Sequence, residues 1–430
     1  MNGASGLTGQ TDFEIRLNMI PRIVPAALCL LVAACSDDDP CEGISGACVG
    51  VAAGATAEDI QTALLEVPEG GTVAFAAGRY DIATELSLDV DGVTLRGAGM
   101  DATVLSFAGQ TSGAQGLLVT ADDFTAHDFA IEDTAGDGLK VLGGTGVTIR
   151  KVRVEWTGGP AEDNGAYGLY PVQCENVLIE DSIVKGASDA GIYVGQSSKI
   201  VVRNSRAELN VAGIEIENST HADVFGNTAT NNTGGILVFN LPGLEVANGA
   251  TTRVFDNELF ENNTENFAPE GNIVGMVPAG TGIAILAAHQ VEVFGNTIRD
   301  HQAINIGIIS YVPIGEFDDP EFDQYPTAID IHDNTLSGTS DMPNGLLGGL
   351  LISAIGELRP NGPFIVPDIA WDGVLDPERD PDAPEHKLCI RNNGDADFIN
   401  LAWPLGDDGI PSEDLSPHDC AHAPLAPVEL

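Results

Sequence analysis

A short tract in which apolar and polar residues alternate after a glycine recurs through the middle of the chain. Copies begin at Gly168, Gly191, Gly213 and Gly235, so successive copies lie 23, 22 and 22 residues apart. Alternation with a period of two is typical of a β-strand that buries one face. A repeat of this length suits one coil of three short strands, so the pattern predicts a solenoid of stacked parallel strands.

A second repeated tract runs in phase with the first and ends at Asn, Asp or an adjoining Ser. Asn and Asp tolerate left-handed backbone conformations, so these endings suit the corner between two sheets. Stacked corners place such side chains over one another, and we therefore expect a ladder with a structural role. The copies are Val177–Ser182, Ile200–Ser205, Ala222–Asn227, Arg253–Asn257, Glu292–Asn296 and Ile329–Asn334.

The pattern changes before the repeats. Residues from Thr56 to Leu64 predict a short amphipathic helix, with Thr56 as its N-cap and Asp59 three residues further on. A helix at the open end of a strand stack covers apolar surface and unpaired strand edges. We therefore expect this helix to cap the first coil.

The pattern also fails after the repeats, where Pro becomes frequent. The sequence as a whole predicts an all-β fold, a right-handed parallel β-helix over residues 51–337 with an insertion near 241–280. Residues 338–430 are expected to form a Pro-rich, irregular C-terminal cap, because they contain no apolar pattern long enough for a separate domain.

The N-terminal residues resemble an export signal. Met19 precedes an Arg and an apolar run over Ile23–Ala34, which ends in small residues before Cys35. The run is too short to span a bilayer core of about 30 Å. We expect residues 1–34 to be a signal peptide with its true start at Met19, Cys35 to be lipidated, and 35–50 to be a tether. A bacterial envelope lipoprotein of the outer membrane is thus predicted; an ordinary cleaved signal is the alternative.

The remaining cysteines fit an exported protein, where disulfides are permitted. Cys41 and Cys48 are close enough in sequence to close a small loop, and Cys389 and Cys420 a larger one. Cys174 lies inside a repeat, where we expect a buried thiol. The spacings do not match those of a zinc site.

The net charge of the chain limits the classes of partner that it can bind. With 18 basic and 64 acidic residues the formal net charge is −46. This field opposes nucleic acid and bare anionic lipid, which leaves the lipid anchor as the expected membrane contact. It also opposes acidic polysaccharides unless divalent cations intervene, so Ca²⁺ is a candidate cofactor. In the alternative interpretation the acidic surface only keeps the protein soluble.

Several stretches resemble known families. The predicted cap helix and the Gly-rich segments up to residue 99 resemble the first coils of pectate-lyase-like right-handed β-helix proteins. The stretches GASDAGIYVGQS, VAGIEIENS and TNNTGGILVFNLPGLEV are similar to bacterial exported parallel β-helix repeat proteins, over roughly residues 50–312. The resemblance implies the fold but no reaction, since related β-helices include lyases, hydrolases, epimerases, adhesins and binding scaffolds.

Side chains between the bore-filling Ile and Val residues are expected to face outward and, with coils about 4.8 Å apart, to form a continuous ridge. The ridge mixes aromatic, acidic and amide groups, which suits a carbohydrate. Its four amides have a structural alternative, in which they satisfy one another as a ladder. The predicted substrate-binding residues are Lys140, Trp156, Tyr170, Gln173, Gln196, Asn218 and Asn240.

Four residues of the same surface are candidates for catalysis: Asp189, Tyr193, Glu215 and Glu217. Two carboxyl groups about 5 to 10 Å apart suffice for glycoside hydrolysis. A lyase or epimerase instead needs a base, for which a tyrosine is conceivable. Outward charges on a solenoid also occur simply as a solvated face, and no His spacing suggests a metal site.

These observations favour an envelope protein whose ridge binds a polysaccharide. Whether it also processes the polymer, as a lyase, hydrolase or epimerase, is left open by the residues. The competing hypothesis is a non-enzymatic envelope scaffold or protein-interaction module. We expect the protein to be a monomer or to have an unknown envelope partner.

Overall fold

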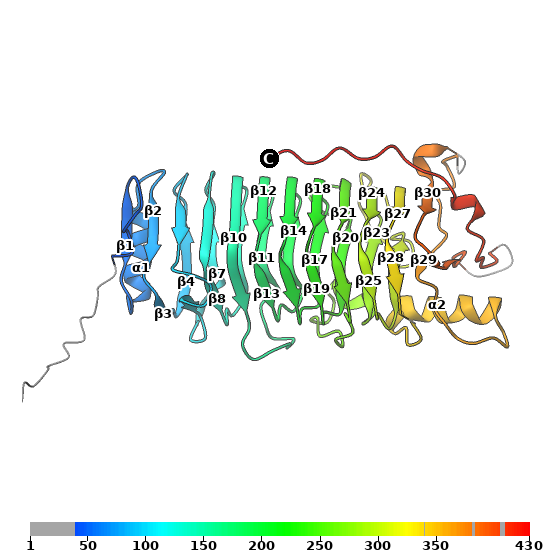
Figure 1. Ribbon diagram of the computed structural model, residues 1–430, viewed down its shortest axis with the longest axis horizontal. Helices are drawn as coiled ribbons and strands as arrows, with labels where there is room; N and C mark the ends of the chain where they lie inside the picture. The colour runs from blue at the N-terminus through cyan, green and yellow to red at the C-terminus, as the bar shows by residue number, and fades with distance from the viewer. Residues whose placement is uncertain (1–38, 339, 381–382, 405–408) are drawn as a thin grey trace, which may run out of the picture. The chain divides into compact units, whose positions relative to one another are not determined.

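The computed structural model describes residues 39–338, 340–380, 383–404 and 409–430. Within them the chain winds into coils, and each strand pairs in parallel with the equivalent strand of the next coil (Figure 1). One long sheet, sheet B, forms one side of every coil. Its strands are β4 (Thr84–Leu88), β7 (Ser112–Val119), β9 (Asp137–Leu142), β11 (Tyr167–Val172), β14 (Ala190–Gly195), β17 (Ala212–Glu217), β20 (Gly234–Phe239), β23 (Thr281–Leu286), β26 (Ile304–Ile309), β29 (Ile369–Trp371) and β31 (Phe398–Asn400).

The second sheet, sheet A, bends into two rows, because β8 and β10 each pair with strands of both rows. The predicted three-strand coil is therefore present. Sheet A contains β1 (Cys48–Val51), β2 (Thr72–Phe75), β3 (Gly78–Asp81), β5 (Thr94–Arg96), β6 (Thr103–Ser106), β8 (Thr125–Glu132), β10 (Thr145–Glu155), β12 (Glu175–Glu180), β13 (Ile183–Lys185), β15 (Ser198–Arg203), β16 (Arg206–Glu208), β18 (Thr220–Phe225), β19 (Thr228–Thr230), β21 (Ala250–Phe255), β22 (Glu258–Phe260), β24 (His289–Phe294), β25 (Thr297–Arg299), β27 (Thr327–His332), β28 (Thr335–Ser337) and β30 (Leu388–Arg391).

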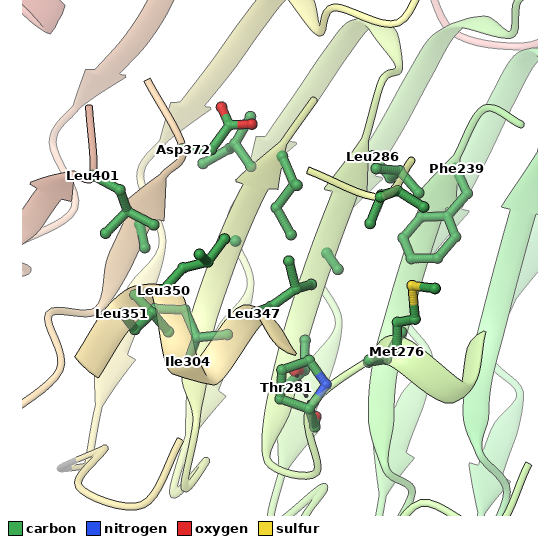
Figure 2. A pocket seen from close by; sticks show the side chains of 18 of the residues that line it. Phe239, Met276, Thr281, Leu286, Ile304, Leu347, Leu350, Leu351, Asp372 and Leu401 are labelled. Atoms are coloured by element: carbon green, nitrogen blue, oxygen red, sulfur yellow. Dashed lines mark hydrogen bonds between the residues drawn. The ribbon is translucent and has the colours of Figure 1, made fainter. Parts of the chain in front are cut away.

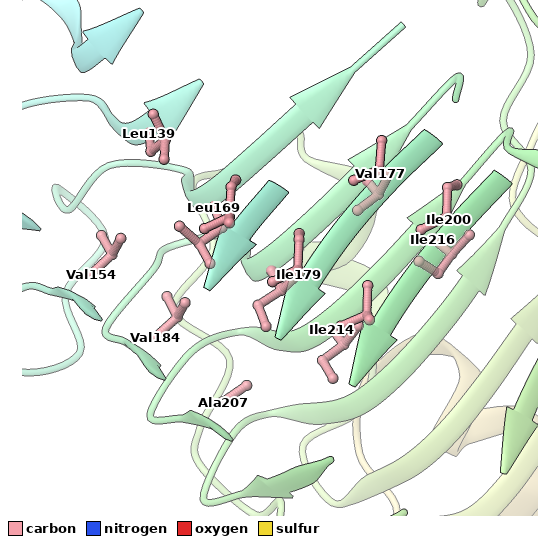
Figure 3. Packing of buried hydrophobic residues seen from close by; sticks show 14 of the residues in the cluster. Leu139, Val154, Leu169, Val177, Ile179, Val184, Ile200, Ala207, Ile214 and Ile216 are labelled. Atoms are coloured by element: carbon pink, nitrogen blue, oxygen red, sulfur yellow. The ribbon is translucent and has the colours of Figure 1, made fainter. Parts of the chain in front are cut away.

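The bore is filled by the alternating apolar residues of the repeats. Ile192, Ile214 and Ile236 lie opposite one another in adjacent strands and are fully buried. Figure 3 shows the same interior with Leu139 and Leu169 facing side chains from sheet A. Each such side chain contributes about 1.5 to 3 kcal/mol by leaving water, so the coils hold one another together along the whole stack.

Two ladders of Asn side chains occupy the corners of the coil. In the predicted one, the amide nitrogen of Asn227 donates to Asn257 Oδ1 at 3.1 Å, and Asn257 donates to Asn296 at 2.9 Å, continuing through Asn334 and Asn393. The second, at the corner before sheet B, was not anticipated; it joins Asn210, Asn232, Asn262 and His301. Both ladders satisfy buried polar groups that the corners would otherwise leave without partners.

The first coil is capped as predicted by α1 (Ala57–Glu66). Thr56 and Asp59 form a reciprocal capping box, and Ile60, Ala63 and Leu64 are the buried face of the helix. The nearby Cys41 and Cys48 are joined in a disulfide. The predicted signal peptide and the lipid acceptor Cys35 lie outside the described residues.

The C-terminal region differs from the predicted irregular cap. The strands β29 and β31 extend sheet B and β30 extends sheet A, so the coils continue beyond residue 337. A helix, α2 (Gly345–Leu358), precedes them, and short turns of 3₁₀-helix occur at η2 (Pro384–His386) and η3 (Ser416–His418). A Cys389–Cys420 disulfide joins this region together.

The last residues run back along the outside of sheet A, as the red segment in Figure 1 shows. The backbone N–H groups of His422, Leu425 and Val428 donate to the carboxylates of Asp330, Glu292 and Asp223, each at 3.1 Å. The tail therefore covers part of sheet A.

The segment predicted as one insertion near 241–280 is two loops with strands between them. Residues 240–249 form the first loop, β21 and β22 follow in sheet A, and residues 261–280, which include η1 (Ile273–Met276), form the second. We call residues 261–280 the cover loop, because its Val274 and Val277 pack on the outer face of sheet B.

Candidate functional site

The parallel register of sheet B brings the predicted ridge residues together. Lys140 on β9 lies opposite Tyr170 on β11, and Tyr193 on β14 lies opposite Glu215 on β17. Asp189 immediately precedes β14 and Glu217 ends β17. Residues far apart in the sequence thus share one surface of four neighbouring coils.

This surface is not the solvent-facing ridge that the alternation predicted. Tyr193 is 4% exposed and Glu215 is 3% exposed, and the cover loop packs on this face, where Asn272 donates to Asp189 and Val277 lies against Gly234 of β20. These side chains do point away from the bore, as the alternation requires. The sequence pattern specifies only the direction in which a side chain points, whereas a loop from a later coil decides whether it meets water.

Three tyrosines form the aromatic part of the site. The ring centroids of Tyr167 and Tyr193 are 4.4 Å apart, those of Tyr167 and Tyr170 are 4.5 Å apart, and those of Tyr170 and Tyr193 are 5.0 Å apart. Such tilted and edge-on arrangements suit the ring quadrupoles. We call Tyr167, Tyr170 and Tyr193 the tyrosine trio.

Glycine at position 195 makes room for one of these rings. A Cβ atom added there would lie 2.3 Å from the hydroxyl oxygen of Tyr193. The Tyr193 ring therefore lies over Gly195, and its hydroxyl donates to Oε1 of Glu217 at 2.5 Å. A larger residue at position 195 would displace the Tyr193 ring and separate its hydroxyl from the Glu217 carboxyl group.

Asp189, Glu215 and Glu217 form what we call the acidic cluster, and their contacts differ. Asp189 Oδ2 accepts from the Tyr167 hydroxyl at 3.4 Å and from the Asn272 amide of the cover loop at 3.2 Å. Glu215 is the deepest of the three, and its buried Oε2 has no hydrogen-bond partner among the described residues. Leaving a buried polar atom unsatisfied costs about 1 to 3 kcal/mol.

Burial changes the protonation of the whole cluster, because a charged carboxylate is poorly solvated there. Burial, aided by the charge of Glu217, raises the pKa of Asp189 to about 7. Burial also raises the pKa of Glu215 well above its ordinary value, and Asp189 and Glu217 add to this. The pKa of Glu217 is raised by burial and lowered in part by the Tyr193 hydrogen bond.

The rim of the site is more accessible. Lys140 and Tyr170 are half-buried, and the Lys140 ammonium lies 4.6 Å from the centre of the Tyr170 ring. Burial raises the pKa of the nearby Asp137 to about 6, although Lys140 opposes the effect. Asp137 and Tyr167 were missed by the sequence prediction. Both stand two positions before a bore-filling residue, Leu139 or Leu169, so strict alternation would place them inside the bore and gives no signal for them.

The four predicted amides do not line this surface. Gln173 donates to Glu245, and Gln196 accepts from the Glu245 backbone. Asn218 donates to backbone oxygens of residues 241, 246 and 247, and Asn240 bonds Gly249 in both directions. These amides therefore hold the loop over residues 240–249 in place rather than stacking only on one another.

Trp156 also lies apart from the site. It is 5% exposed at a corner next to Gly186, and its indole N–H donates to the Thr134 carbonyl at 2.8 Å. The neighbouring Arg153 pairs with Glu132 and Glu155. The Trp156 side chain is thus held by contacts within this corner, although Arg153 Nε has no hydrogen-bond partner among the described residues.

An apolar pocket continues the same face of sheet B toward the C-terminal coils, and no sequence pattern pointed to it. Figure 2 shows Phe239 and Leu286 from the sheet facing Met276 of η1 and Leu347, Leu350 and Leu351 of α2. Asp372 at its edge is held by the backbone and hydroxyl of Ser310. The pocket thus presents almost no polar group to a ligand.

Two further features of the described chain bear on cofactors and membranes. No cluster of three or more His, Cys, Asp or Glu residues in the described ranges is arranged to hold a metal ion. None of the helices seen there has the length and apolar character needed to cross a bilayer. The Ca²⁺ prediction remains a prediction.

Comparison with known proteins supports the fold. Residues 115–306 match the family model described as a right handed beta helix region. Together with the parallel register of both sheets, this confirms the predicted right-handed parallel β-helix. No curated protein sequence gives a significant match.

Solved structures with similar coils are distant in sequence. The A-module of mannuronan C-5 epimerase AlgE4 from Azotobacter vinelandii is 21% identical, with a TM-score of 0.46 over 70% of this chain and 87% of that one. Alginate lyase from Paenibacillus is 16% identical, with a TM-score of 0.43 over 68% and 96%. Endopolygalacturonase I from Stereum purpureum is 14% identical, with a TM-score of 0.39 over 69% and 94%. These likenesses are too distant to indicate a substrate or a reaction for this chain.

Proposed function

We propose that this protein binds a polysaccharide on the outer face of sheet B, where the tyrosine trio and the acidic cluster meet the rim residues Asp137 and Lys140. Aromatic rings stack on the apolar faces of sugars, and carboxyl groups bond their hydroxyls. The observation that carries the proposal is Glu215, a buried acid with an oxygen unsatisfied within the described chain. Perturbed, unpaired acids of this kind cluster at functional sites.

The protonation of the site favours hydrolysis over elimination if the bound polymer is processed. With a pKa of about 7, Asp189 keeps its proton often enough near neutral pH to act as a general acid. Burial raises the pKa of Tyr170 to about 12 and that of Tyr193 further, so neither tyrosine is a good base. Among the predicted catalytic residues, the carboxyl groups are therefore the better candidates, and Tyr193 acts as a hydrogen-bond donor.

A glycan array probed with the intact protein tests the proposal. Tyr170→Ala removes a half-buried ring at the rim and should weaken glycan binding at least about tenfold, the size of one aromatic contact. Tyr325→Ala, in a loop outside the site, is the matched control and should bind as the parent does. A parent protein that binds no glycan contradicts the proposal and would favour a scaffold that docks an envelope partner.

We also propose that the protein is held in the bacterial envelope by lipid on Cys35. The support is the signal-like sequence that ends at this cysteine. In cells fed a radiolabelled fatty acid, the parent should take up label and remain with the membranes. The Cys35→Ala variant should take up none, and an equal uptake by both proteins contradicts the anchor.

A further inference from the structure

We propose that the ligand of this site carries positive charge, as the ammonium groups of an amino-sugar polymer do. The inference rests on the proposed function and narrows it to one class of polysaccharide. It is motivated by an imbalance of charge in the site, by the unsatisfied Glu215 and by the surface that the tyrosines form.

The acidic cluster lacks the cations that accompany two buried acids on sheet A. On sheet A, the 4%-exposed Asp223 is held by two hydrogen bonds from Arg253, and Asp330 is paired with Arg391 although its Oδ1 has no hydrogen-bond partner among the described residues. The side chains that donate to Asp189 and Glu217 are the uncharged Tyr167, Asn272 and Tyr193, and Glu215 Oε2 has no partner among the described residues. A buried carboxylate without a partner is costly, so a cation from outside would relieve a real deficit.

The missing partner has the properties of an ammonium group. An ammonium offers three N–H donors and no acceptor, whereas a sugar hydroxyl offers one donor and its own acceptor lone pairs. Glu215 Oε2 needs a donor, and the oxygens of Asp189 and Glu217 can accept further hydrogen bonds. An ammonium group at this site would supply the donor that Glu215 Oε2 lacks.

The tyrosine trio already attracts such a group. The ammonium of Lys140 lies over the Tyr170 ring, which is an arrangement of the cation–π kind. The Tyr167 and Tyr193 rings adjoin Tyr170 on the side of the acids. A ligand ammonium arriving beside Lys140 would therefore meet aromatic faces first and carboxyl groups behind them.

A ligand can reach the acids at the edge of the cover loop. Asp189 and Glu217 are each 8% exposed, so these two residues lie nearer the surface than Glu215. The Asn272 amide of the cover loop donates an N–H to Asp189 Oδ2. A ligand N–H can take this position, and Glu215 lies behind it.

The same arrangement opposes a uronic acid polymer. Its carboxylates would meet the acidic cluster and the field of a chain whose net charge is −46. A fully N-acetylated amino sugar avoids repulsion, yet it brings no charge to the carboxyl groups.

Binding of a cation should release protons. The raised pKa values mean that the cluster holds protons near neutral pH, and a cation favours the ionised carboxylates. The other titratable groups that face the cluster are Asp137 and Lys140 on β9, Tyr167 and Tyr170 on β11 and Tyr193 on β14, while the cover loop presents the uncharged Asn272. Proton release therefore distinguishes a cation held at the acids from one held elsewhere.

The test is calorimetric titration of the intact protein with three hexasaccharides, made of glucosamine, N-acetylglucosamine and galacturonate. The titrations are run at about pH 6, below the ordinary pKa of an amine, in two buffers of different ionisation enthalpy. The glucosamine hexamer should bind one to one, at least about tenfold more tightly than the other two, with release of protons. Tighter binding of either other hexamer overturns this inference and leaves polysaccharide binding intact, whereas no binding at all removes the proposed function.

Two variants distinguish binding at this site from the general attraction between a polycation and an acidic protein. Glu215→Gln keeps the shape of the side chain and should weaken the glucosamine hexamer about tenfold and reduce proton release. Glu175→Gln, an exposed acid paired with Lys199 on sheet A, is the matched control and should change neither. If Glu215→Gln and Glu175→Gln bind the glucosamine hexamer with equal affinity, the charge of the whole surface explains the binding, and the inference is wrong.

Discussion

Two halves of one surface of sheet B have opposite chemistry although their backbones are continuous. One row of outward positions runs from Tyr193 to Glu215 and then to Leu237, Ala284 and Gly307 on successive strands. The change from acid to apolar residue occurs in one step, between β17 and β20. The cover loop packs over both halves, since its Asn272 donates to Asp189 on the polar side and its Val277 lines the apolar pocket.

The two halves contribute to stability in opposite directions. The apolar half gains free energy from every side chain that it removes from water. The polar half buries three acids without cations from the described chain and leaves one oxygen unsatisfied, which lowers stability. A solenoid that can place leucine at position 237 has no structural need for glutamate at 215, and this favours a functional role for the acids.

Introducing an acid at the equivalent position of the next strand should have the largest effect on stability. Leu237→Glu places a carboxyl group in a fully buried, apolar position and should lower the free energy of unfolding by about 4 kcal/mol. Thermal unfolding followed by circular dichroism measures the change. A variant as stable as the parent would show that the apolar half also tolerates acids. The contrast between the halves would then no longer favour a functional role for the acidic cluster.

Removing a large side chain from the apolar half should be slightly less damaging. Phe239→Ala deletes a ring that lines the pocket and packs in the same cluster as Val274, and it should cost about 3 kcal/mol in the free energy of unfolding. Chemical denaturation provides the measurement. Glycan binding at the polar half should be retained, and its loss would mean that the two halves do not act separately.

The polar half should respond to pH. In the folded protein the pKa of Asp189 is raised from 3.8 to about 7, so the native state binds more protons than the unfolded state between these values. The stability from this carboxyl group is therefore complete below its unfolded pKa and is lost as the pH rises toward 7. The melting temperature of the parent minus that of Asp189→Asn should fall over this range.

The matched control is Asp181→Asn, an exposed corner residue outside the site, which accounts for the effect of changing an Asp to Asn elsewhere in the protein. A difference between the parent and Asp189→Asn that does not change with pH would show that folding does not raise the pKa of this carboxyl group.

Loosening the cover loop should have the smallest effect. Asn272→Ala removes one hydrogen bond to Asp189, worth about 1 kcal/mol, while the apolar contacts of Val274 and Val277 remain. Because this bond lowers the pKa of Asp189, its loss should raise that pKa, which NMR titration of the carboxyl group can follow. Asn248→Ala, in the loop over residues 240–249, is the control and should leave the pKa unchanged.

The fold could be predicted from the sequence because its causes are local and repeated. The alternation around Ile192 and Ile214 and the Asn at each corner occur once per coil, and the cap of α1 depends on neighbours three residues apart. The helix α2 was missed because its apolar residues surround several glycines in a region without repeats.

The site could be predicted only in part. Register placed Tyr193, Glu215 and Glu217 together, since equivalent positions of parallel coils lie side by side. Their burial depends on the cover loop, which returns to this surface from about 60 residues later and has no periodic pattern. For the same reason, the roles of Asn272 and of the amides that hold the loop over residues 240–249 could not be read from spacing.

The central claim, that the acidic cluster is kept for a ligand at a cost in stability, is tested most directly by Glu215→Leu. Thermal unfolding is measured for this variant and the parent, each with and without the glucosamine hexamer. Without ligand the variant should melt above the parent, because replacing an unpaired buried acid by an apolar side chain stabilises the fold. With ligand the parent should gain stability and the variant should gain none. A variant that melts below the parent, and that is stabilised equally by the hexamer, would contradict the claim.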